Sequence, residues 1–109
     1  MKKYEFGEIV LLSFPMANYF DIKKRPALVI LDTGDEDFLA ARITTLISRG
    51  KYDYEIAKWR ESGLLRPSVI RLDKIATLEK SLVLKKLGAL DKTENIEAKK
   101  IIRMICESI

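Results

Sequence analysis

Two short segments of the chain place cations where they could bind a phosphate. Lys23, Lys24 and Arg25 stand directly before a proline and an apolar run, and a guanidinium held at such a place can make two parallel hydrogen bonds to a phosphate. Arg42 and Thr44 alternate within a second apolar run and would share one face of a strand. Ordinary surface charges and a packing threonine would give the same patterns, so both interpretations stay open.

Aromatic side chains lie close to the first group of cations. Tyr19 and Phe20 precede Lys23 in the connection between two apolar runs. Rings beside cations suit single-stranded nucleic acid, because bases stack on the rings while ammonium groups hold phosphates. Arg66 precedes a later alternating segment, and Lys74 lies on the polar side of that segment. A plain loop with one buried ring and solvated cations would look the same.

The chain contains no histidine, and this excludes several kinds of catalysis. Its 109 residues include 20 Lys and Arg against 16 Asp and Glu, and the net charge of +4 favours anionic partners without demanding them. A Ser–His–Asp triad, a Cys–His pair, a His-ligated zinc ion and a paired-histidine ribonuclease mechanism are all impossible. Any catalysis must use Arg, Lys, Tyr, Thr, Ser or carboxylates.

Composition also bounds the organisation and the compartment of the protein. We expect one domain over residues 1–109, because the chain has the length of one domain and no composition shift marks a linker. Its apolar runs are too short for a transmembrane helix, and Glu5 and Glu8 interrupt the stretch where a signal peptide would lie. Cys106 is the one cysteine and cannot form an internal disulfide. We therefore expect a cytoplasmic protein with no membrane association.

Short strands followed by one helix are the elements expected to position the candidate residues. Apolar runs bounded by Pro, Gly and acidic turns predict strands at 8–14, 27–31, 38–47, 54–56 and 68–78, with Pro26 just before the second. In the last strand Ile70, Leu72 and Ala76 would share a face, and residues 80–92 are interpreted as a solvated turn.

The end of the chain changes to a helical period. Apolar residues from Thr93 to Cys106 recur at helical spacing, and Asp91 with Glu94 forms a capping box that predicts the helix start. Cys106 would lie on the apolar side of this helix. Strands followed by one helix indicate a mainly β (α+β) fold, a small curled antiparallel sheet or barrel with a C-terminal α-helix.

In their order along the chain, these segments resemble the MazF/PemK-like toxin family of type II toxin–antitoxin modules. The resemblance covers residues 7–106 and depends on the order and spacing of five segments rather than on one motif. These segments are Gly7-Glu8-Ile9-Val10, Arg25-Pro26 with its apolar run, Ile43-Thr44-Thr45, Gly63-Leu64 leading to Ser68-Val69-Ile70, and 73–78 followed by Leu87-Gly88.

The resemblance implies an SH3-like barrel that forms a homodimer and cuts single-stranded RNA without a metal or other cofactor. The RNA 2′-hydroxyl attacks the adjacent phosphate in this family, leaving a 2′,3′-cyclic phosphate and a 5′-hydroxyl end. The essential Arg of the family falls on Arg25, and its strand Thr falls on Thr44. The partners implied are a cognate antitoxin with an acidic, disordered tail, whose complex with the toxin binds DNA, and an RNA held by Tyr19, Phe20, Lys23, Lys24, Arg42, Arg66 and Lys74.

Some features leave alternatives open. The group that accepts the 2′ proton is not identified, and Asp21 is one carboxylate that could serve. Leu46 stands where many relatives have Gln, and Ala76 stands where many have Arg, so a barrel that binds RNA or an antitoxin with reduced activity is one alternative. A non-enzymatic toxin that binds gyrase, as in the CcdB group, is the other.

Overall fold

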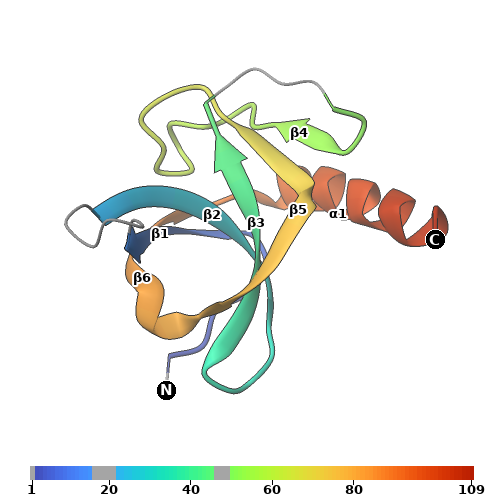
Figure 1. Cartoon of the computed structure of the whole chain (residues 1–109). Coiled ribbons are helices and arrows are strands. Elements are labelled where there is room, and N and C mark those ends of the chain that lie inside the picture. The colour runs from blue at the N-terminus through green and yellow to red at the C-terminus, as the bar shows by residue number, and fades with distance from the viewer. Residues whose placement is uncertain (1, 16–21, 46–49) are drawn as a thin grey trace.

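In the part of the chain that the structure describes, six antiparallel strands form one strongly curled sheet with one α-helix at its side (Figure 1). The computed structural model describes residues 2–15, 22–45 and 50–109. The sheet order is β4-β5-β3-β2-β1-β6. The elements are β1 (Glu8–Pro15), β2 (Ile22–Asp32), β3 (Asp37–Thr44), β4 (Asp53–Glu55), β5 (Val69–Glu79), the 3₁₀ turn η1 (Lys80–Leu82), β6 (Val83–Ala89) and α1 (Lys92–Glu107).

The predicted fold class is confirmed, with one element missed. Residues 80–92 are not a solvated turn, because η1 and β6 occupy most of them and β6 pairs with β1. Strand β6 is at the edge of the sheet, so Leu84, Lys85 and Lys86 are exposed and the apolar alternation that marks a half-buried strand is missing.

Strand β2 begins earlier than predicted, and Pro26 lies inside it. Pro26 faces Leu11 of β1, whereas the pairing of β2 with β3 stops at Ala27 and Arg42. The first part of β2 is therefore a local edge of the sheet. A residue without an N–H is tolerated there because no ladder hydrogen bond is lost on the free side.

The central strands are buried on both faces, which gives the protein two apolar cores. The first core packs the sheet against α1 and contains Ile9, Leu28, Ala41, Ile43, Ile56, Leu64, Ile70, Leu72, Leu90 and Ala98. The second core lies on the other face and contains Tyr4, Val10, Leu12, Ala27, Val29, Phe38 and Ala40. Adjacent residues of one strand enter different cores because side chains alternate across a sheet.

Strand β5 carries a bulge that changes which way its side chains point. Arg42 of β3 faces Arg71, but the preceding residue Ala41 faces Ile75, so 72–74 are additional residues on the β5 side. A bulge of this kind bends a strand and re-aims the side chains beyond it. The prediction that Ala76 shares a face with Ile70 and Leu72 is therefore wrong. Ile70 and Leu72 lie in the first core, and Ala76 lies outside it.

Helix α1 begins at the predicted place, but only half of the capping box forms. Asp91 accepts a hydrogen bond from the Glu94 backbone N–H at 2.8 Å. The buried Glu94 side chain instead turns to the strand side, where its Oε1 accepts from the Tyr54 hydroxyl at 2.8 Å and from the Ala57 N–H at 2.7 Å. Burial beside this carboxylate raises the pKa of Tyr54.

Cys106, near the end of α1, is exposed rather than buried. The side chains that pack against the first core are instead those of Ala98, Ile101, Ile102 and Ile105.

At the end of the second core, the carboxylate of Asp32 bonds to three segments of the chain, at Tyr4, Gly34 and Lys80. Its Oδ2 accepts from the Tyr4 N–H at 2.8 Å, and its Oδ1 accepts from the Gly34 N–H at 2.8 Å and from Lys80 Nζ at 2.9 Å. The Tyr4 ring packs on Phe38 with 5.7 Å between ring centroids. The hydrogen bond from Lys80, together with the two backbone hydrogen bonds, lowers the pKa of Asp32 to about 2.

We predict that Asp32→Asn lowers the free energy of unfolding at neutral pH, and that the gap to the parent protein closes as the pH falls from about 5 to about 2. An Asp with a depressed pKa stabilises the folded state above its unfolded pKa of about 4 and loses that effect as acid protonates it. Urea unfolding followed by Trp59 fluorescence at several pH values measures the gap. A pH-independent gap would contradict the prediction, and Asp73→Asn, at an exposed position, serves as the matched control.

Candidate functional site

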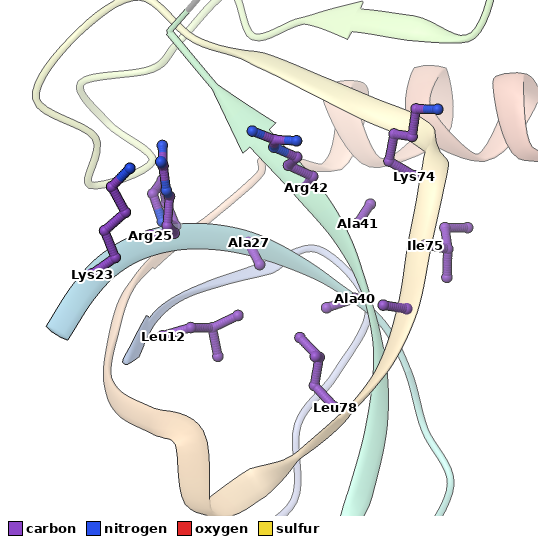
Figure 2. Close-up of a pocket in the computed structure, with 12 residues that line it drawn as sticks. Leu12, Lys23, Arg25, Ala27, Ala40, Ala41, Arg42, Lys74, Ile75 and Leu78 are labelled. Atoms are coloured by element: carbon purple, nitrogen blue, oxygen red, sulfur yellow. The ribbon is translucent and has the colours of Figure 1, made fainter. Parts of the chain in front are cut away.

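A pocket of about 550 Å³ opens where the second core reaches the surface (Figure 2). Leu12, Ala27, Ala40 and Leu78 give it an apolar floor that continues this core. The walls are completed by Pro26, Ala41, Ile75 and Ala76. Several of these residues are alanines, so the strands enclose free space here instead of packing tightly.

Four cations surround this floor, and we call them the cationic rim: Lys23 and Arg25 from β2, Arg42 from β3 and Lys74 from β5. Figure 2 shows the nitrogen-bearing ends of all four on the same side of the pocket. Arg and Lys side chains only donate hydrogen bonds. In the described part of the chain, the charged residues that line the pocket are all positive, so the pocket mouth attracts anions.

Strand alternation divides the cations predicted from the sequence. Lys23, Arg25 and Ala27 share the pocket face of β2, while Lys24 is exposed and does not line the pocket. Arg25 is half-buried, and it lies directly opposite Leu12 of β1. The packed strand beneath Arg25 therefore limits the freedom of its long side chain, as a group that must recognise a phosphate requires.

Thr44 lies on the same face of β3 as Arg42. Ala27 and Arg42 are the last register pair between β2 and β3. Arg25 precedes Ala27 by two residues in β2, and Thr44 follows Arg42 by two residues in β3. Because the strands are antiparallel, Arg25 and Thr44 lie toward the same end of the strand pair. Thr44 is half-buried and faces Val69 of β5, and it does not itself line the pocket.

Lys74 reaches the rim because it belongs to the β5 bulge. Arg71, at the start of the bulge, instead lies 3.5 Å from Asp53 between Nε and Oδ1 and does not line the pocket. Regular alternation would give Lys74 the face of Leu72, which is buried in the first core. The bulge therefore decides that this cation joins Arg42 at the pocket.

The remaining predicted residues fall into two groups. Arg66 is exposed in the segment between β4 and β5 and does not line the pocket. Tyr19, Phe20, Asp21 and Leu46 lie outside the described residues.

Sequence reasoning missed the apolar floor. Leu12, Ala40 and Leu78 come from three different strands and were visible only as ordinary strand residues. Ala76, which stands where many relatives have Arg, was the one sequence signal of this free space, because a small side chain at this position leaves the pocket open.

The described part of the chain contains neither a metal site nor a membrane-spanning helix. Within residues 2–15, 22–45 and 50–109, no group of three or more Cys, Asp and Glu side chains could hold a metal ion. The helix found in these residues is too short and too polar to cross a membrane.

A protein-family model identifies the family of this chain. The family model described as "PemK-like, MazF-like toxin of type II toxin-antitoxin system" matches residues 5–106. No curated protein gives a significant match.

Solved structures share the fold at low sequence identity. An endoribonuclease in complex with its cognate antitoxin from Mycobacterial species is 17% identical, with a TM-score of 0.73 over 94% of this chain and 93% of that chain. The Mycobacterium tuberculosis toxin MazF-mt6 is 22% identical, with a TM-score of 0.68 over 87% and 91%. A MazE–MazF complex from Deinococcus radiodurans is 18% identical, with a TM-score of 0.70 over 94% and 95%.

Proposed function

Because the chain belongs to the PemK-like, MazF-like toxin family of type II toxin–antitoxin systems, we propose that it is an endoribonuclease that cuts single-stranded messenger RNA in the cytoplasm. The observation that carries this proposal is the cationic rim, in which Arg25 stands with three other cations around one pocket. The similar structures named as endoribonucleases support the same activity. The cut is sequence-selective, and a homodimer is the active form.

The proposed reaction needs neither histidine nor a metal. The 2′-hydroxyl gives up its proton as its oxygen bonds to the adjacent phosphorus. The bond from phosphorus to the 5′-oxygen of the next nucleotide breaks, and that oxygen takes up a proton. The products are a 2′,3′-cyclic phosphate and a 5′-hydroxyl end. Negative charge builds up on the phosphorane between these steps, and a fixed guanidinium at Arg25 stabilises it, a contribution of about 3 kcal/mol.

Thr44 has a positioning role in this proposal. It lies on the same strand face as Arg42, one alternation step further along β3. Its hydroxyl can donate to a phosphate oxygen or hold the 2′-hydroxyl in line with phosphorus. A guanidinium has N–H donors and no acceptor, so a group other than Arg25 must accept the 2′ proton.

We predict that the purified protein cuts long single-stranded RNA in the presence of EDTA and that Arg25→Ala lowers the rate constant about 100-fold. That factor corresponds to the loss of about 3 kcal/mol of transition-state stabilisation. Mapping both ends of the fragments identifies the cyclic phosphate and the 5′-hydroxyl. The rate constant of Arg25→Lys, which keeps the charge but loses the planar guanidinium, should lie between those of the parent protein and of Arg25→Ala.

Four outcomes would contradict this proposal in whole or in part. Cleavage only after metal addition would refute the mechanism, and unaltered cleavage by Arg25→Ala would remove this residue from the site. Tight RNA binding without cleavage would favour a barrel that only binds RNA or an antitoxin, the alternative motivated by Leu46 and by Ala76 in the pocket. Uncut RNA together with inhibited supercoiling by gyrase would favour the CcdB-like alternative.

We predict that Lys23→Ala weakens RNA binding while Lys24→Ala leaves it nearly unchanged, since the two lysines occupy opposite faces of β2. Binding of a 2′-O-methyl oligonucleotide, which cannot be cut, is measured by fluorescence anisotropy over a range of salt concentrations. Loss of one phosphate contact should lower the slope of log K against log salt by about 0.7. Equal slopes for the two variants would show that Lys23 makes no such contact.

The proposed antitoxin partner carries an acidic tail that covers the cationic rim and competes with RNA. We predict that cleavage falls as the cognate antitoxin is added and recovers when the RNA concentration is raised. An antitoxin whose tail Asp and Glu residues are replaced by Asn and Gln is the matched control and should inhibit weakly. Undiminished cleavage at saturating antitoxin would rule out this mode of neutralisation.

A further inference from the structure

The pocket offers more than a phosphate site, because its interior is apolar. The cationic rim alone would serve a phosphate, yet beneath it lies a floor made of Leu12, Ala27, Ala40 and Leu78 (Figure 2). The volume of about 550 Å³ lies in the range of pockets that hold small organic ligands. In single-stranded RNA the group with a flat apolar face is the base, and unstacked bases are what proteins read in such RNA.

We propose that this pocket is a subsite for one unstacked base of the RNA and that it favours bases with keto oxygens, uracil and guanine, over cytosine and adenine. This inference rests on the proposed function, since it assigns a base to the same site that holds the phosphate. It adds a rule for base selection that follows from the chemistry of the rim.

The preference follows from which groups can donate. Arg42 presents five N–H donors and Lys74 presents three, and neither side chain can accept a hydrogen bond. Uracil presents O4 and guanine presents O6 and N7, which are acceptors that match these donors. In place of these keto oxygens, cytosine carries the N4 amino group and adenine carries the N6 amino group, so a donor would face a donor at that position. The acceptor N7 is common to adenine and guanine and does not distinguish them.

The lining of the pocket sharpens this selection. Each lining side chain that the structure describes is either apolar or cationic, so these side chains supply donors and apolar surface to a base. The N4 amino group of cytosine or the N6 amino group of adenine, placed against Arg42 and Lys74, therefore gains no side-chain acceptor from them, and a polar group without a partner is disfavoured. The 2-amino group of guanine lies away from the edge that carries O6 and N7.

Ala40 and Ala76 set the room for the base. They face each other directly across β3 and β5, and both line the pocket. Ala76 is exposed, so a longer side chain at this position can extend over the pocket without disturbing the packing of the second core. A glutamine at position 76 would add a neutral side-chain carbonyl acceptor to the described lining, whose side chains supply none.

The test uses 2′-O-methyl oligonucleotides of seven residues that differ only in the central base, which is U, G, C or A. We expect the full-length protein to bind the U and G oligonucleotides at least about fivefold more tightly than the C and A oligonucleotides. Ala76→Gln should reduce this ratio towards one by accepting a hydrogen bond from the amino group. Thr77→Gln is the matched control, because Thr77 is the next residue of β5 and does not line the pocket.

Equal affinity for the four oligonucleotides, or tighter binding of C and A, would overturn the inference. A preference that Ala76→Gln and Thr77→Gln leave equally intact would place the selecting group elsewhere and would also overturn it. Cleavage of long RNA is measured separately on the same preparations. Cleavage with no base preference contradicts this inference alone, whereas a base preference without cleavage contradicts the proposed function alone.

Discussion

The burial of the central strands on both faces is the constraint on which the rest of the structure depends. One helix covers one face of the sheet, so the sheet must curl to bury the other face, and this curl creates the second core. Side-chain alternation then sends Ala27 and Ala40 inward and their neighbours Leu28 and Ala41 towards α1. The pocket is the place where the second core reaches solvent, so its apolar floor is a direct consequence of the curl.

The same alternation explains why the cations gather at the pocket. Strands β2 and β3 continue beyond their last register pair and past the second core. On the face that carries the second core, the residues of this continuation lie at the solvent-exposed mouth of the pocket. Arg25 occupies such a position, and Arg42 belongs to the last pair itself, where its side chain lines the pocket. Lys74 joins them only through the bulge in β5. Like charges repel one another, so an anion bound between the four cations of the rim would lower their electrostatic repulsion.

The cationic rim accounts for how a chain without histidine can bind a phosphate and stabilise its negative charge. Guanidinium and ammonium groups stay charged through the physiological pH range, so the rim supplies a constant field instead of a proton shuttle. The packed strands beneath Arg25 fix its backbone, and electrostatic stabilisation by a preorganised group needs little rearrangement during reaction. The chemistry that this site can offer is therefore charge stabilisation and positioning, with proton transfer left to other groups.

The sequence by itself determined the elements that carry a local signal. The helix from about Thr93 to Cys106, its cap at Asp91 and most strands were predictable, because periodicity and capping are encoded within a few neighbouring residues. Edge strand β6 and the split between Lys23 and Lys24 needed the structure, since both depend on what lies across the sheet. The pocket was decided by tertiary structure alone. Its lining comes from β1, β2, β3 and β5, and curl, register and bulge are long-range properties that no local pattern specifies.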